Sequence, residues 1–137
     1  TEVEACARAF LYFFQVGGTI QAQLAECFND DEWVDSFLAQ SRHGLQEAVR
    51  ATTSMLDELG APYVEPQGSL FVWADFSRWS AIVGGEFELF KQLASLPGGG
   101  VLMCPGSTFH ADKEGWFRIC VTSAPAGHLE VALARLK

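Results

Sequence analysis

One arginine stands in the middle of a segment that is otherwise typical of a β-strand, Gly115-Trp-Phe-Arg-Ile-Cys-Val-Thr122. Alternation along a strand places Phe117, Ile119 and Val121 on one face and Arg118 on the other. A guanidinium is a planar fork of donors that matches both oxygens of a carboxylate. Arg118 could therefore bind a carboxylate ligand, pair with one of the 17 acidic residues, or lie exposed on an uncovered sheet face.

Other residues capable of chemistry fit structural roles better. The run Pro97-Gly98-Gly99-Gly100 precedes a predicted strand, and no Lys-Ser or Lys-Thr follows it, so it does not match a phosphate-binding loop. The acidic residues 30–32 suit the first turn of a helix. The possible metal ligands are Cys104, His110, Cys120 and His128. Their spacings match no common zinc site, so we predict no metal site. We also predict no catalytic residue in this chain.

The elements that would position Arg118 are predicted from the period of the apolar residues. A long helix starts at Asn29-Asp30-Asp31-Glu32, carries apolar residues at spacings of three, four and seven, and ends at Gly60. After Pro62 the period changes to two, which is typical of strands. The remaining predicted helices are 2–15, 19–28 (capped by Thr19), 86–96 and 125–135; the predicted strands are 63–64, 69–75, 101–104 and 115–122. This order predicts an α+β fold in which helices cover a small, mostly antiparallel sheet.

The composition limits which kinds of partner and which cellular compartment we expect for the chain. The 137 residues are 49% hydrophobic, and the net charge of −8 argues against a nucleic-acid or anionic-membrane surface. The apolar run Ala9–Phe14 is too short to span a membrane, and no basic region precedes it as in a signal peptide. The four cysteines lie far apart, which predicts reduced, buried thiols in a reducing, cytoplasmic compartment.

The first predicted helix is apolar on every side, which is typical of a helix buried on every side. Its apolar residues are Phe10, Leu11, Tyr12, Phe13 and Phe14. We expect them to cover a surface that another domain or subunit supplies. An isolated chain is then expected to self-associate or to rearrange this helix.

Two adjacent motifs resemble a known family. Pro105-Gly-Ser-Thr-Phe-His110 followed by Gly115-Trp-Phe-Arg-Ile-Cys120 is similar to the end of the class I and II aminotransferases, and most similar to the 1-aminocyclopropane-1-carboxylate synthases and their relatives. The similarity extends to Gly68–Asp75 and over nearly the whole chain. It implies the small domain of an aminotransferase-like enzyme of fold type I.

The resemblance implies a pyridoxal phosphate (PLP) enzyme that acts on an amino acid, with Arg118 binding the substrate α-carboxylate. Residues 1–28 would lead in from a large domain, and residues 29–137 would form the C-terminal small domain of a homodimeric enzyme. A synthase would convert S-adenosylmethionine by an α,γ-elimination that closes a cyclopropane ring. An aminotransferase would exchange an amino group with a keto acid, and a third reading is a non-catalytic interaction module.

The chain departs from the family in its lysines. The family's cofactor-binding lysine stands in a Ser-x-Ser-Lys setting, and Lys91, Lys113 and Lys137 have no such setting. The resemblance therefore implies that the lysine and the cofactor site belong to a large domain upstream of Thr1. We predict that this chain by itself binds no PLP and converts no substrate.

Overall fold

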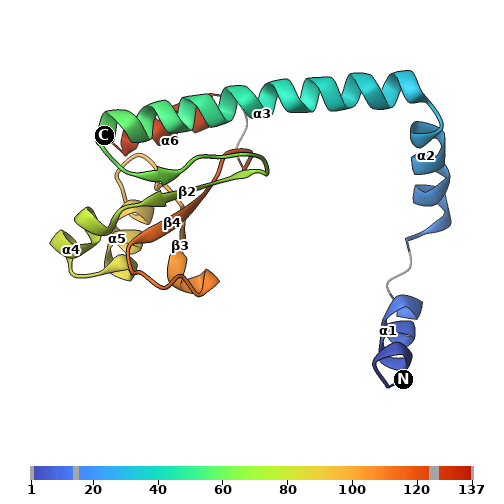
Figure 1. Cartoon of the computed structure of the whole chain (residues 1–137), viewed down its shortest axis with the longest axis horizontal. Coiled ribbons are helices and arrows are strands. Elements are labelled where there is room, and N and C mark those ends of the chain that lie inside the picture. Colours follow the sequence, from blue (N-terminus) through green and yellow to red (C-terminus); the bar gives the residue numbers. More distant parts are fainter. Residues whose placement is uncertain (1, 14–15, 124–126, 137) are drawn as a thin grey trace. The chain divides into compact units, whose positions relative to one another are not determined.

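The computed structural model of the chain describes residues 2–13, 16–123 and 127–136 (Figure 1). It divides into two compact units, Thr1–Ser41 and Arg42–Lys137. The helices are α1 (Glu2–Phe13), α2 (Gly18–Phe28), α3 (Asp31–Leu59), α4 (Ser77–Val83), α5 (Glu86–Ala94) and α6 (His128–Arg135), with a 3-10 turn η1 (Gly106–Phe109). The strands are β1 (Tyr63–Val64), β2 (Phe71–Asp75), β3 (Cys104–Pro105) and β4 (Trp116–Cys120). The unit boundary falls inside α3, and the domain boundary proposed after Phe28 stays a prediction.

The first unit is helical, as predicted, with one correction at the start of α2. The helix begins at Gly18, and its N-cap residue is Gly17, so Thr19 lies inside the first turn and the predicted Thr19 cap is wrong. Gly17 has an extended backbone, and its carbonyl accepts the first intrahelical bond from the Gln21 N–H at 3.1 Å.

Apolar side chains of the first unit remain exposed. On α2 they recur every fourth residue at Ile20, Leu24 and Phe28, which places them on one helix face. Trp33 and Phe37 stack on one another in the first turns of α3, with ring centroids 5.3 Å apart, and both are exposed. Exposed apolar side chains are thus present on α2 and at the start of α3. The side chains of Phe10 to Phe14, on which the prediction for that helix rests, lie outside the described residues.

Both ends of α3 are those that the sequence predicts. At its start, the carboxylate of Asp30 accepts a hydrogen bond from the Trp33 N–H at 2.9 Å, which satisfies one donor of the first turn. At its end, Gly60 takes a positive φ of 65°, and the Ala61 N–H donates to the Leu56 carbonyl at 2.9 Å. The described part of the chain contains no helix that is both long and apolar enough to cross a membrane.

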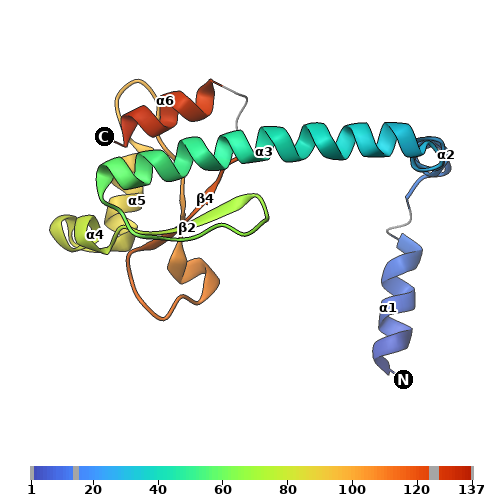
Figure 2. The same cartoon turned by 45° about the horizontal axis from the view of Figure 1, so that its top comes forward.

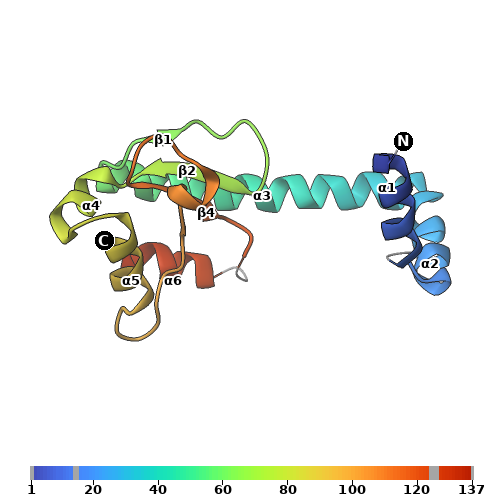
Figure 3. The same ribbon diagram turned by 90° about the horizontal axis from the view of Figure 1, so that it is seen from below.

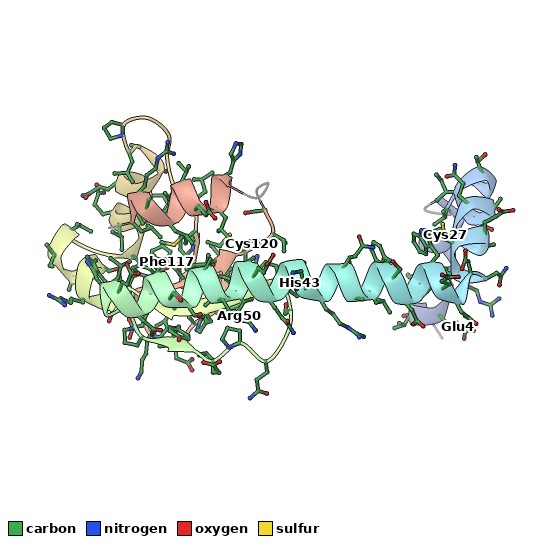
Figure 4. The ribbon with its side chains drawn as sticks, turned by 90° about the horizontal axis from the view of Figure 1, so that it is seen from above. Glu4, Cys27, His43, Arg50, Phe117 and Cys120 are labelled. Atoms are coloured by element: carbon green, nitrogen blue, oxygen red, sulfur yellow. The ribbon has the colours of Figure 1, made fainter. Side chains whose placement is uncertain are left out.

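The second unit is an antiparallel sheet in the order β1-β2-β4-β3, covered on one face by helices. Figures 1 and 2 show α3 and α6 on one side of the sheet and η1 on the other. The covered face holds Val72, Ala74 and Phe117, all 0% exposed, together with Ile119 and Val121. Figure 4 looks onto the helical layer and labels Phe117 between α3 and α6. The predicted core face of β4 is therefore confirmed, and it leaves Arg118 on the opposite, open face.

Two local features around the sheet differ from the prediction. The strand predicted at 101–104 is only Cys104–Pro105, because the Val101 N–H is bonded at 2.9 Å to the Leu93 carbonyl at the end of α5. The strand ends at Pro105, and Gly106 begins η1. Helix α4 was not predicted; it begins where the Asp75 carboxylate accepts the Ser77 N–H at 2.8 Å. The Pro125 end of the predicted last helix lies outside the described residues.

The glycine run serves a structural purpose, as the sequence indicated. A Cβ on Gly100 would lie 2.0 Å from the Ala94 carbonyl oxygen, so the chain passes too close to α5 for a side chain. The guanidinium of Arg135 on α6 donates to the carbonyls of Gly98 and Gly99, at 2.5 and 2.9 Å. The loop between α5 and β3 is thereby fastened to α6.

Candidate functional site

Arg118 lies at the centre of the open sheet face. It is the middle residue of β4, and its backbone is paired with Trp73 on β2 and with Cys104 on β3. Residues that are paired directly across antiparallel strands share a face. Figure 3, seen from below, shows β2 and β4 side by side. The register therefore places the side chains of Phe71, Trp73 and Trp116 on the same face as Arg118.

The guanidinium of Arg118 lies between two aromatic rings. Its Cζ is 4.1 Å from the centroid of Phe71 on β2 and 3.9 Å from the centroid of Phe109 on η1. Such contacts with the faces of aromatic rings stabilise a cation. The edge of the guanidinium, which carries its N–H donors, remains for other partners.

No described acidic residue uses that edge. Arg118 is half-buried and forms no ion pair with any residue that the structure describes, and its buried Nε has no hydrogen-bond partner there. Buried polar groups normally have partners, so a donor without one is an unusual feature. Neither an internal ion pair nor full exposure matches this environment, and the arrangement suits a planar anion that approaches the edge.

An aromatic platform, made of Phe71, Trp73, Phe109 and Trp116, surrounds the arginine. Trp73 stacks on Trp116 with centroids 5.9 Å apart, and it meets Phe109 edge-on at 6.3 Å. Gly106 allows this packing, because a Cβ there would lie 3.1 Å from Cη2 of Trp73 and 2.7 Å from the Trp116 carbonyl oxygen. The platform provides an apolar wall beside a fixed positive charge. In such an apolar environment, ionic hydrogen bonds are stronger than in water.

Sequence reasoning singled out Arg118 but missed the two rings that contact it. Phe71 could have been found from strand alternation once β2 and β4 were paired in register. Phe109 carried a weaker signal, since it belongs to the Pro-Gly-Ser-Thr-Phe motif, but only the turn of η1 brings its ring back to the sheet.

The two lysines that the structure describes are both exposed. Lys91 is exposed on α5 and forms an ion pair with Glu88 at 2.7 Å, and Lys113 is exposed in the loop before β4. Lys137 lies outside the described residues. The role of this chain in binding a cofactor therefore stays a prediction.

The burial of the four cysteines differs from the prediction. Cys6 and Cys104 are exposed, Cys27 and Cys120 are half-buried, and all four are free, so the expectation that they are buried is wrong. Cys104 lies on the short edge strand β3, and strand alternation places Cys120 on the same face of β4 as Arg118. Desolvation raises the pKa of the Cys120 thiol, but hydrogen bonds from Thr122 and Ser123 outweigh this effect and hold it below its ordinary value.

We predict that Thr122→Val raises the pH at which alkylation of Cys120 reaches half its maximal rate. The Thr122 hydroxyl lies 3.7 Å from the Cys120 sulfur, and its loss removes a group that stabilises the thiolate. The rate is followed with iodoacetamide by mass spectrometry of the Cys120 peptide across a pH series. Thr53→Val serves as the control, because the Thr53 hydroxyl bonds to the Val49 and Arg50 carbonyls and is not among the groups that shift the pKa of Cys120. An identical midpoint in Thr122→Val and in the unmodified protein contradicts this prediction.

Comparisons with known proteins relate this chain to a family. A family model described as aminotransferase class I and II matches residues 1–136. The 1-aminocyclopropane-1-carboxylate synthase of Glycine max is 32% identical over 134 residues, which are 96% of this chain and 27% of that protein. The 1-aminocyclopropane-1-carboxylate synthase 4 of Solanum lycopersicum is 32% identical over 138 residues, covering 99% of this chain and 29% of that protein.

Solved structures share the fold. A tetra mutant of Thermus thermophilus aspartate aminotransferase has a TM-score of 0.64 at 26% identity, covering 77% of this chain and 26% of its own. Escherichia coli YbdL, for which a methionine aminotransferase function has been identified, has a TM-score of 0.72 at 22% identity, covering 92% of this chain and 32% of its own. The predicted α+β fold is thus confirmed, and the chain spans less than a third of the length of each of these relatives. Because the family model and the synthase relatives cover almost every residue, the chain belongs to the class I and II aminotransferase family.

Proposed function

We propose that this chain is the small domain that binds the substrate carboxylate in a PLP-dependent enzyme acting on an amino acid. The observation that carries the proposal is the guanidinium of Arg118, fixed between Phe71 and Phe109 and without an acidic partner among the described residues. A carboxylate is the planar anion that matches the free edge of such a guanidinium. Membership of the class I and II aminotransferase family supports an amino acid as the source of that carboxylate.

In this proposal the chain orients the substrate and the cofactor performs the bond chemistry. When PLP is bound in the complete enzyme, it supplies an electron sink for the amino acid's α-carbon. Arg118 fixes the α-carboxylate through two parallel N–H donors, which sets the rotation of the substrate about its α-carbon. The aromatic platform excludes water from one side of that ion pair and so strengthens it.

Within the family we propose a 1-aminocyclopropane-1-carboxylate synthase-like lyase. The curated synthases of Glycine max and Solanum lycopersicum support this choice, at 32% identity over nearly the whole chain. The substrate would be S-adenosylmethionine, and the complete protein would function as a homodimer whose large domain covers the open sheet face. Formation of 1-aminocyclopropane-1-carboxylate from S-adenosylmethionine by the complete protein tests this choice.

An amino-acid aminotransferase is the second candidate, supported by the likeness to the Thermus thermophilus aspartate aminotransferase structure at 26% identity. It would transfer the amino group to a keto acid and form no cyclopropane product. A protein that retains the fold as an interaction module would do neither. The two product assays, run on the same preparation, separate these three outcomes.

The proposal predicts where PLP is attached in the complete protein. After reduction with borohydride and digestion, we expect the pyridoxyl group on a single lysine outside residues 1–137, because Lys91 is exposed and ion-paired and Lys113 is exposed. Peptide mapping by mass spectrometry identifies the lysine, and a sample without PLP serves as the control. A pyridoxyl group at Lys91, Lys113 or Lys137 would overturn the assignment of this chain as the carboxylate-binding part.

A further inference from the structure

Glu86 is a buried carboxylate whose role in the domain is not explained by its place at the start of α5. It is 3% exposed and forms no ion pair with the described residues. Its Oε1 accepts hydrogen bonds from the N–H and the hydroxyl of Ser107, at 3.0 and 2.7 Å. Its Oε2 accepts the Gly115 N–H at 2.7 Å. A buried carboxylate is costly without such donors, so the site is built around it.

These bonds join three segments that are distant in sequence. Ser107 belongs to η1, Gly115 immediately precedes β4, and Glu86 opens α5. The contact is reciprocal, because the Glu86 N–H donates at 2.9 Å to Oε1 of Glu114, the residue just before Gly115. The Gly115 carbonyl in turn accepts the Phe76 N–H at 2.7 Å. Glu86 is thus the common partner of the 3-10 turn and of the start of the strand that carries Arg118.

Both segments held by Glu86 determine the environment of Arg118. Phe109 lies two residues after Ser107 in the same 3-10 turn, and its ring covers one side of the guanidinium at 3.9 Å. Arg118 lies three residues after Gly115. A shift of η1 relative to β4 would therefore move the ring away from the cation.

We propose that Glu86 is a positioning residue for Arg118. Its carboxylate holds η1 against the start of β4, and this keeps Phe109 on the guanidinium. The consequence for substrate affinity rests on the proposed function, but the consequence for the geometry of Arg118 does not.

Glutamine is the informative substitution, because it keeps the shape of Glu86 and removes its charge. All three partners of the carboxylate are donors, and the amide NH₂ must point at the Ser107 pair or at the Gly115 N–H. In either orientation one donor loses its acceptor, which weakens the attachment of Glu86 either to η1 or to the start of β4. Glu88→Gln on the same helix is the matched control, since Glu88 is bonded to Lys91 and not to η1.

The test is the rate at which phenylglyoxal modifies each arginine of the complete protein, measured by mass spectrometry. In Glu86→Gln we expect modification of Arg118 to become about tenfold faster, equivalent to about 1.4 kcal/mol, because Phe109 no longer covers the guanidinium. Arg50, exposed on α3 (Figure 4), reports general loosening and should keep its rate. Glu88→Gln should leave both rates unchanged.

Two results overturn the inference: an unchanged rate at Arg118 in folded Glu86→Gln, or an equal rise at Arg118 and Arg50. If Glu86→Gln does not fold, Ser107→Ala, which removes only the hydroxyl donor, is judged by the same criteria. In the enzyme assay, Glu86→Gln should raise KM for the amino acid more than it lowers kcat, and should add nothing in the R118A background. If R118A itself leaves KM unchanged, the proposed function fails, while the labelling rates still decide the role of Glu86.

Discussion

Replacing Arg118 with alanine in the complete protein is expected to raise KM for the amino acid substrate by about 100-fold. Each charge-assisted hydrogen bond contributes roughly 1.5–3 kcal/mol, and tenfold in affinity corresponds to about 1.4 kcal/mol. At the lower end of that range, two bonds to one carboxylate account for about two orders of magnitude. The expected change in kcat is smaller, because the carboxylate is held in the substrate and in the transition state alike. Steady-state kinetics with the substrate varied gives both constants.

Two further variants make the result specific to this guanidinium. Arg118→Lys keeps the charge but loses the fork and the stacking on Phe71 and Phe109, so its KM should lie between those of the parent and the alanine variant. Arg50→Ala removes an exposed arginine of α3 and should change nothing. A KM for Arg118→Ala within twofold of the parent would remove Arg118 from the binding site and leave it with a packing role.

Gly115→Ala is expected to lower the free energy of unfolding by about 3 kcal/mol or more, the range in which a strained backbone and a steric clash combine. Gly115 has a φ of 90°, and a Cβ there would lie 2.4 Å from Cα and 2.8 Å from N of Ser77. Both neighbours are backbone atoms at the start of α4, which cannot rotate away as a side chain would. The strand start must shift, and with it the hydrogen bond from the Gly115 N–H to Glu86. Urea denaturation followed by circular dichroism measures the loss.

Gly44→Ala is the matched control for this substitution. Gly44 lies inside α3, and a Cβ there has no heavy atom within 4 Å. Alanine is better than glycine in a helix interior by roughly 0.5–1 kcal/mol, so this variant should be slightly more stable. Equal stabilities for Gly115→Ala and the parent would show that the turn before β4 adapts to a side chain, contrary to the packing described above.

The sequence predicted the parts of the fold that depend on local periodicity. The capping residue Asp30, the apolar stripe of α3 and the Gly60 end are each encoded within a few residues, and the structure has them. Strand alternation likewise placed Phe117 in the core and Arg118 on the opposite face. These predictions succeeded because one residue type and its near neighbours determine each outcome.

The missed features depend on contacts between distant segments. The strand expected to start at Val101 starts only at Cys104, because the Val101 N–H bonds to the end of α5, which no local pattern reveals. Glu86 was indistinguishable in sequence from any acidic residue that begins a helix, and only the tertiary fold brings Ser107 and Gly115 to its oxygens. One part of the site could be predicted, because an arginine such as Arg118 is unusual in a strand. The contact with Phe109 could not, because only the 3-10 turn brings that ring to the guanidinium.

The pairing of β2 with β4 has a consequence for how the protein is made. Phe71 pairs with Cys120 and Asp75 with Trp116, so the central ladder joins residues more than forty positions apart. During synthesis only the short β1–β2 pair is available until β4 has left the ribosome, and a two-stranded ribbon of this kind is marginally stable. Phe71 therefore emerges without its partner Cys120, and Trp73 has only Val64 of β1 beside it, for the time needed to add β3 and β4. Contacts of such long range also slow folding. This interval is the stage at which the nascent chain is most open to aggregation and to chaperones.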